Sequence, residues 1–116
     1  MERRVSTRVN VTKPIHVRSL DTKVPLRLID VGDGGMSVGT AVPLPVGVVM
    51  RFEFSTDDGL WTAFLSGQSV YCRTRQDHGN EGYQTGFRYL NQDAPAVADK
   101  IGQLVDKASV DSLTIL

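Results

Sequence analysis

The interpretation of the fold depends on the stretch RLIDVGDGGMSVGT, residues 27–40. Four of its fourteen residues are glycine and two are aspartate, and apolar runs flank the glycines on both sides. Such a run forms a phosphate loop, a metal loop or a tight turn. Because the flanking residues are strand-like, we interpret it as a strand, a turn and a second strand.

The other two interpretations fail on spacing. The segment DVGDGG begins like a calcium loop, but no acidic residue closes it at the required distance. Phosphate loops of the GxxxxGK[ST] or GxGxxG kind lead into a helix, whereas Gly34-Gly35 leads into the strand-like MSVGTAV. The stretch therefore predicts neither a metal loop nor a phosphate loop.

The composition indicates one globular domain over residues 1–116. The chain has no formal net charge, 41% of its residues are hydrophobic, and it contains no apolar run long enough to span a bilayer. The single Cys72 excludes an internal disulfide, and its place in an alternating run favours packing in the core. With no export signal at the N-terminus, we expect a cytoplasmic protein without membrane insertion.

The hydrophobic pattern is mostly that of strands. Alternating runs predict strands at residues 9–18, 23–31, 36–42, 48–55 and 83–90, and one or two strands over residues 60–75. Pro14 argues for an edge or a bulge in the first run, Asp57-Asp58-Gly59 is a hairpin signal, and Gly67 predicts a bulge or bend.

Only residues 94–108 have helical periodicity. Pro95 suits the first turn, Asp93 can cap it, and an apolar stripe is formed by Val97, Ile101, Leu104 and Val105. The last residues, VDSLTIL, are apolar enough for a packed tail or a final strand. Many short strands and one late helix predict a small antiparallel barrel or sandwich.

A catalytic or metal site is not indicated. The only histidines, His16 and His78, lie far apart in the sequence, and a zinc site would need clustered Cys and His residues. We therefore expect neither an enzyme nor a metalloprotein.

The residues best suited to binding are three arginines and one aspartate. The N-terminal ERRVSTRVNV carries Arg3, Arg4 and Arg8, and a guanidinium can grip phosphate oxygens, pair with the O6/N7 edge of guanine or stack on a base. Asp30 can accept hydrogen bonds from the N1–H and N2–H₂ groups of guanine, which arginine cannot do. Together these residue types fit a guanine nucleotide.

The order and spacing of these motifs resemble the PilZ domain family. Its signatures RxxxR and [DN]xSxxG match Arg4 to Arg8 and residues 30–35, and PVGVVMRFEF, SGQSVYC and GYQTGFRYL resemble its downstream strands. The resemblance implies an all-β fold, a six-stranded antiparallel barrel with a C-terminal helix. It also implies the ligand cyclic di-GMP, often bound as a stacked pair.

The resemblance assigns roles to particular residues. Arg4 and Arg8 would contact the phosphates and guanines, Asp30 a guanine edge, and Gly35 would form the turn that lets the ligand dock. Arg3 would add a stacking or phosphate contact. We expect the N-terminal arm, residues 1–8, to be flexible without ligand and to wrap over it when bound.

One residue departs from the motif. Gly32 occupies the place of the family's serine, so a hydroxyl in the ligand site is missing. If that hydroxyl makes a buried hydrogen bond to the ligand, its loss costs about 0.5–1.5 kcal/mol, or roughly 2- to 13-fold in affinity. The sequence predicts weakened binding at Gly32, not its abolition.

Two functions stay open. The first is a cyclic di-GMP receptor that acts in trans on an effector protein controlling motility, biofilm exopolysaccharide or virulence in bacteria. The second is a PilZ protein-interaction module with weak or no nucleotide binding. Intact RxxxR and Asp30 favour the first. Neither function involves DNA or RNA, and the chain would be a monomer or a weak dimer.

Overall fold

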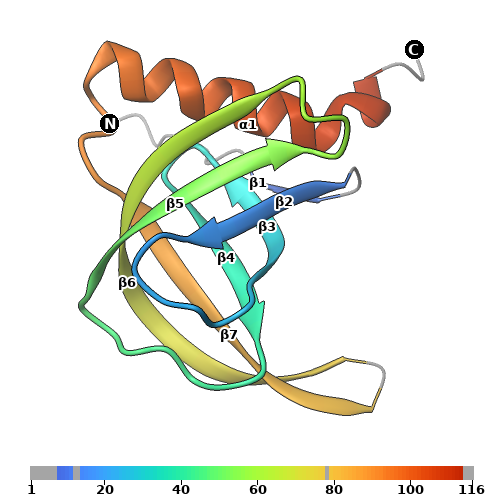
Figure 1. The fold of residues 1–116 in the computed structure, drawn as a ribbon, viewed down its shortest axis with the longest axis vertical. Coiled ribbons are helices and arrows are strands. Elements are labelled where there is room, and N and C mark those ends of the chain that lie inside the picture. Colours follow the sequence, from blue (N-terminus) through green and yellow to red (C-terminus); the bar gives the residue numbers. More distant parts are fainter. Residues whose placement is uncertain (1–7, 12–13, 78, 114–116) are drawn as a thin grey trace, which may run out of the picture.

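The sheet is a curled, all-antiparallel one with a single helix across its end. The computed structural model describes residues 8–11, 14–77 and 79–113. Their elements are β1 (Arg8–Asn10), β2 (Ile15–Ser19), β3 (Arg27–Gly32), β4 (Gly35–Thr40), β5 (Val49–Thr56), β6 (Thr62–Asp77), β7 (Asn80–Tyr89) and α1 (Pro95–Leu113). The strand order is β1-β3-β4-β7-β6-β5-β2, and Figure 1 shows the sheet curling into a partly open barrel. The predicted antiparallel barrel with a late helix is thus confirmed.

The barrel has seven described strands instead of the six expected, because residues 9–18 do not form one strand. Pro14 lies between β1 and β2, and a proline has no backbone N–H to continue a ladder. The two short strands then pair with different partners, β1 with β3 and β2 with β5, at opposite edges of the sheet. Because of this split, residues 8–10 pair with β3.

The core fills the space inside the curled sheet. Phe52 and Phe87 meet edge to face, with ring centroids 4.9 Å apart. The alternation predicted over residues 48–55 is confirmed at Met50, Phe52 and Phe54, which are buried, but Val48 is 38% exposed. Each such buried side chain stabilises the fold by about 1.5–3 kcal/mol.

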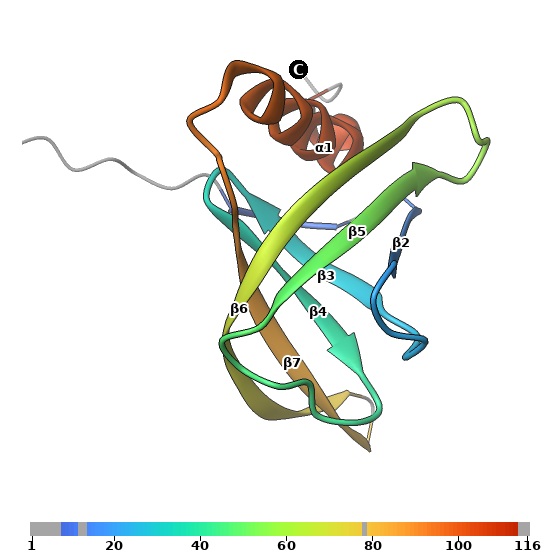
Figure 2. The same cartoon turned by 60° about the vertical axis from the view of Figure 1, so that its left-hand side comes forward.

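Helix α1 covers one open end of the barrel, as Figure 2 shows. Its predicted apolar stripe is confirmed: Ile101 and Leu104 are buried in the core, and Val97 and Val105 pack against it half-buried. The helix is longer than the expected 94–108, because residues 110–113 continue it instead of forming a tail or strand. No described helix is both long and apolar enough to pass through a bilayer.

A bulge or bend was predicted at Gly67, but the irregularity of β6 lies two residues further on. The register of the β6–β7 pair shifts between Ser69 and Tyr71, not at Gly67. Gly67 has a different role, since a Cβ there would lie 3.2 Å from the Cβ of Phe87. The shift matters for the site described next, because it sets Tyr71 opposite Gly86.

Candidate functional site

The glycine-rich stretch forms the β3–β4 hairpin. Asp30 lies near the end of β3, Gly32 ends that strand, and Gly35 begins β4. The β3–β4 register shifts between Leu28 and Asp30, so Leu28 and Val31 are both buried. Asp30 is half-buried, and it pairs across the hairpin with Ser37. The hairpin therefore presents the Asp30 carboxylate on the side of the sheet away from the core.

Strand β1 brings the two sequence motifs together. Arg8 pairs with Gly32 and Asn10 pairs with Asp30 in an antiparallel ladder. The last arginine of RxxxR therefore begins a strand that adjoins the aspartate of the second motif. The predicted arm of residues 1–8 thus ends in a strand at Arg8, while Arg3 and Arg4 lie outside the described residues.

Gly35 is required by strand packing. It pairs with Arg88 at the start of the β4–β7 ladder, and a Cβ at this position would lie 2.2 Å from the carbonyl oxygen of Phe87. No L-residue fits such an approach to a backbone atom. Gly35 was expected to form a turn for the ligand; its position shows a steric reason for glycine that needs no ligand.

A buried amide links the neighbouring strands beside Asp30. Gln84 Nε2 donates to the hydroxyl oxygen of Ser37 at 3.0 Å, and both residues are buried. The other end of the amide, Gln84 Oε1, accepts from Arg73 Nη2 at 3.3 Å and from Arg75 Nη1 at 3.1 Å. Two guanidinium groups thus converge on one neutral oxygen, which concentrates positive charge on this side of the sheet.

An aromatic ring lies flat on the same side. A Cβ on Gly86 would lie 2.1 Å from Tyr71 Cε2, so the ring occupies the space that a side chain at 86 would fill. The guanidinium carbon of Arg73 lies 5.5 Å from the centre of this ring, within the range of a cation–π contact. We call the surface formed by Asp30, Ser37, Tyr71, Arg73, Gln84 and Gly86 the outer face.

Of the outer face, Asp30 alone was among the predicted site residues. The other five were not: Ser37, Tyr71, Arg73, Gln84 and Gly86. Their strands were expected, but their contacts cross from β6 to β7 and on to β4. The only local signal is Gly86 within YQTGFRYL, which marks a strand position without a side chain. Nothing local indicates which ring covers it.

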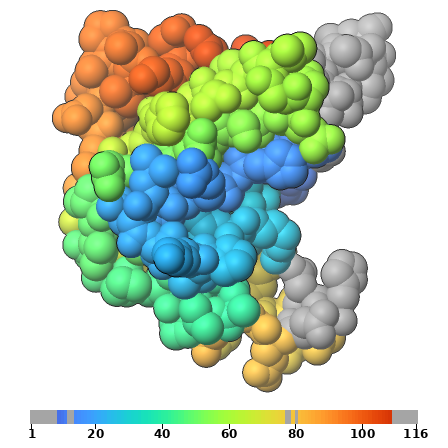
Figure 3. Space-filling view, in the orientation of Figure 1, coloured from blue at the N-terminus to red at the C-terminus, as the bar shows by residue number. Residues whose placement is uncertain are grey.

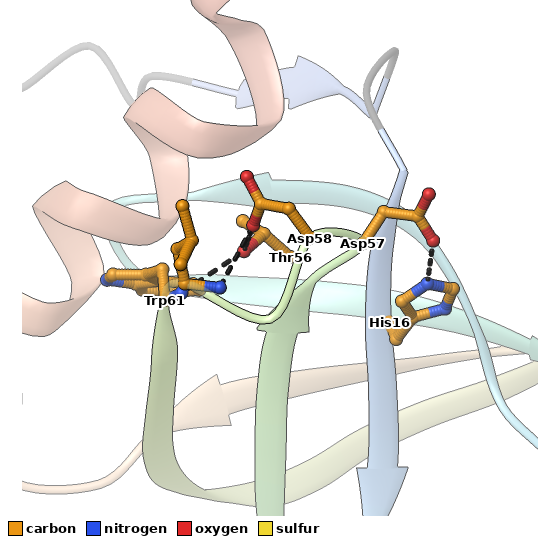
Figure 4. Close-up of polar contacts among 6 residues, drawn as sticks. His16, Thr56, Asp57, Asp58 and Trp61 are labelled. Atoms are coloured by element: carbon orange, nitrogen blue, oxygen red, sulfur yellow. Dashed lines mark hydrogen bonds and ion pairs between the residues drawn. The ribbon is translucent and has the colours of Figure 1, made fainter.

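A second polar cluster lies at the β5–β6 turn, before the start of β6 at Thr62, whereas Tyr71 and Arg73 of the outer face lie further along that strand. His16 Nε2 and Asp57 Oδ1 are 2.9 Å apart and both side chains are exposed. Figure 4 shows Asp58 turned the other way, toward Thr56 and Trp61. Asp58 Oδ1 accepts from Thr56 Oγ1 at 2.7 Å and from the Leu60 N–H at 3.0 Å.

These turn contacts hold the pKa of Asp58 below its ordinary value. The main cause is the hydrogen bond from the Leu60 backbone, followed by the Thr56 hydroxyl; the charge of Lys107 adds to them. Trp61 Nε1 also donates to Gln103 Oε1 on α1 at 2.8 Å. These hydrogen bonds connect the turn to the helix, and the polar groups of the cluster bind other groups of the protein.

Metal ligands are not grouped in the part of the chain that the structure describes. No three histidine, cysteine, aspartate or glutamate side chains there could hold one ion. Cys72 is half-buried and His78 lies outside the described residues.

The sequence matches one known protein family, and the fold is similar to solved structures. The PilZ domain family matches residues 2–107. The fold is similar to the "PilZ domain with c-di-GMP of YcgR from Escherichia coli", with a TM-score of 0.75 and 21% identity over 96% of this chain and 95% of that chain. No curated protein sequence matches significantly.

A second solved structure shares the fold more distantly. It is the "Structure of Bacillus subtilis Inhibitor of motility (MotI/DgrA)", with a TM-score of 0.51 and 15% identity over 90% of this chain. The match spans 52% of that protein, about half its length. The family match over nearly the whole chain leads to one conclusion: the chain belongs to the PilZ domain family.

Proposed function

We propose that the protein is a receptor for cyclic di-GMP, which binds at the outer face and the β3–β4 hairpin. The observation that carries this proposal is the β1–β3 ladder, which sets Arg8 beside Gly32 and Asn10 beside Asp30. Guanine offers donors for a carboxylate and acceptors for arginine, and the phosphodiesters offer further acceptors. The two motifs supply both kinds of partner next to each other.

The ligand would use the side chains in complementary ways. Asp30 would accept from N1–H and N2–H₂ of one guanine, while Arg4 and Arg8 would contact phosphates and the O6/N7 edge. Arg3 would add a stacking or phosphate contact. Tyr71 offers a flat ring on the same face, and stacking of a base on an aromatic side chain contributes about 1–3 kcal/mol.

The N-terminal arm would close the site. Among residues 1–8 only Met1 and Val5 are apolar, so the arm has little to bury without a ligand. Binding would draw residues 1–7 over the nucleotide from the fixed end of β1 at Arg8. Limited proteolysis after Arg3 and Arg4 should then slow when cyclic di-GMP is added; equal cleavage rates would contradict this closure.

The signal would pass to a partner protein. A nucleotide bound to the PilZ domain would act in trans through an altered surface. One structurally similar protein, from Bacillus subtilis, is named an inhibitor of motility. For this chain we propose control of motility, biofilm exopolysaccharide or virulence in a bacterial cytoplasm. The nucleotide is a ligand, and no cofactor or catalytic step is involved.

Titration calorimetry tests this function. Cyclic di-GMP is titrated into the wild type, into Arg4→Ala/Arg8→Ala, and into the matched control Arg18→Ala, an exposed arginine of β2 that contacts Glu53. We expect micromolar or tighter binding by the wild type and Arg18→Ala, and its loss in the double variant. A folded wild type that binds nothing would contradict the receptor.

The second candidate, a protein-interaction module without nucleotide, is favoured by one observation, Gly32 at the motif's serine position. In that case the double arginine variant would still bind the partner and would work in the cell as well as the wild type. A loss of cellular activity in the double variant would rule out this candidate.

A further inference from the structure

A cavity of about 410 Å³ opens at the end of the sheet opposite to the β3–β4 hairpin. Its lining includes Arg27, Gly39, Arg75, Gly82 and Tyr83. In Figure 3 the surface is hollowed between the cyan residues of β3 and the gold residues of the β6–β7 hairpin. Arg27 begins β3 and the motif hairpin follows its other end, so the cavity lies at the far end of these strands, although Arg75 of its lining also donates to Gln84 of the outer face.

Two glycines form the floor of the cavity, and neither has room for a side chain of its own. A Cβ on Gly39 would lie 2.7 Å from Arg27 Nη2, and a Cβ on Gly82 would lie 2.9 Å from the carbonyl oxygen of Thr40. Both positions therefore need glycine. The absence of a side chain at Gly39 lets the Arg27 guanidinium lie over this glycine, at the cavity.

The two arginines stand on different strands at this floor. Arg27 pairs with Gly39 in the β3–β4 ladder, and Arg75 pairs with Gly82 in the β6–β7 ladder. Arg75 Nη1 donates to Gln84 Oε1 at 3.1 Å, which holds its guanidinium in a defined position. A guanidinium held in this way binds a carboxylate with less loss of conformational freedom than a mobile one.

The rest of the lining limits what can enter. Pro25, Leu26 and Ala41 offer an apolar rim, and Glu81 adds one negative charge. The two guanidinium groups outnumber the carboxylate of Glu81, so the lining attracts an anion, and one added carboxylate balances the remaining positive charge. The apolar rim suits the aliphatic neighbours of such a carboxylate on an extended chain.

We propose that this cavity is a docking site for a partner protein, which inserts one glutamate or aspartate side chain from an extended segment between Arg27 and Arg75. The carboxylate binds the guanidinium groups and its aliphatic neighbours lie on the rim of Pro25, Leu26 and Ala41. This docking does not depend on the nucleotide, and it gives the proposed signalling partner a stated chemistry.

NMR titration of the full chain with two short capped peptides tests the proposal. One peptide carries a central glutamate flanked by valines, and its twin carries glutamine instead. We expect the glutamate peptide to bind at least about tenfold more tightly and to shift the amides of Gly39 and Gly82. Equal binding of the two peptides, or shifts confined to other strands, would overturn the proposal.

Two variants test the arginines, and one serves as a matched control. Arg27→Gln should abolish the preference for glutamate, and so should Arg75→Gln. Arg88→Gln, an exposed arginine whose Nη2 contacts Gln68 at the motif end of the sheet, should keep it. Because Arg27 is exposed, its variant should fold; if Arg75→Gln unfolds, Arg27→Gln alone decides, and a retained preference there overturns the proposal.

Other occupants give different results. Inorganic phosphate that shifts the Gly39 and Gly82 amides more strongly than the glutamate peptide would assign the cavity to a small anion and overturn the docking site. Cyclic di-GMP titrated in a separate experiment tests the proposed function alone. A wild type that ignores the nucleotide but selects the glutamate peptide would contradict the receptor and support this docking site.

Discussion

Two turns of this protein are rich in aspartate and glycine, yet they differ in how these residues are used. At the β5–β6 turn, Gly59 has a φ of 76° and nothing lies within 4 Å of where its Cβ would be. The Asp58 carboxylate is used by the turn itself. At the β3–β4 hairpin, Gly35 is fixed by contact with a backbone oxygen, and Asp30 lies on the outer face beside β1.

The difference separates a structural turn from a candidate binding turn. Glycine at 59 serves a backbone conformation that other residues rarely adopt, while glycine at 35 serves the close approach of two strands. One aspartate serves its own turn, and the other stands next to the strand that begins with the last arginine of RxxxR. Composition alone does not distinguish the two turns; their neighbours do.

Replacing the two glycines should give the largest contrast. Gly35→Ala places a methyl group 2.2 Å from the Phe87 oxygen and should lower the free energy of unfolding by roughly 3 kcal/mol or more. Gly59→Ala meets no atoms and should cost about 1–2 kcal/mol, the penalty of a left-handed φ. Urea unfolding of both variants measures the difference between the two losses of unfolding free energy. An equal or larger loss for Gly59→Ala would show that the two glycines do not differ in this way.

Replacing the two aspartates should separate binding from stability. Asp30→Ala removes the carboxylate proposed to read guanine and should weaken cyclic di-GMP binding about ten- to a hundredfold. Asp58→Asn should leave the affinity unchanged, because its contacts stay within the turn. Calorimetry of both variants gives the result, and a similar loss of affinity in both would show that the two turns are not distinct.

Restoring the motif's serine should strengthen the binding turn. Gly32→Ser returns the missing hydroxyl next to the β1 pairing position of Arg8 and should raise the affinity for cyclic di-GMP roughly 2- to 13-fold. Gly34→Ser, on the same hairpin, is the matched control and should leave affinity unchanged. An affinity that falls in Gly32→Ser would mean that this position needs glycine for packing.

The smallest expected effect is the pH response of the structural turn. The pKa of Asp58 is lowered in the folded protein by the Leu60 N–H, the Thr56 hydroxyl and Lys107, so its charge stabilises the fold above the ordinary value of 3.8. That contribution is lost as the pH falls through the lowered folded pKa. The difference in unfolding free energy between the wild type and Asp58→Asn should therefore shrink as the pH falls below the ordinary pKa of aspartate and through the lowered pKa of Asp58. A difference that grows on acidification would contradict this expectation.

Much of the fold could be predicted from local pattern. Alternation predicted the strands of the core, the helical stripe predicted α1, and Asp57-Asp58-Gly59 predicted the β5–β6 turn. The division of residues 9–18 could not be predicted, because alternation shows that a segment is extended but not which strand it joins. Only the pairing of β1 with β3 shows that Arg8, the last residue of the arginine motif, lies opposite Gly32 of the second motif.

The site was predictable only in part for a similar reason. Asp30 and the arginines stand in short motifs that the sequence displays directly. Tyr71 and Gln84 depend on contacts across three strands and on a register shift after Ser69, which no local pattern contains. The reason for Gly35 was hidden as well, because its neighbour Phe87 lies far along the chain.

One titration tests whether the two turns differ in function. Backbone amide shifts of the full chain are followed by NMR while cyclic di-GMP is added. We predict shifts at residues 30–37 and at Tyr71, Gln84 and Gly86 of the outer face, with none at residues 56–61 of the structural turn. Shifts centred on residues 56–61, or no shifts at all with a folded protein, would contradict a binding role for the β3–β4 hairpin.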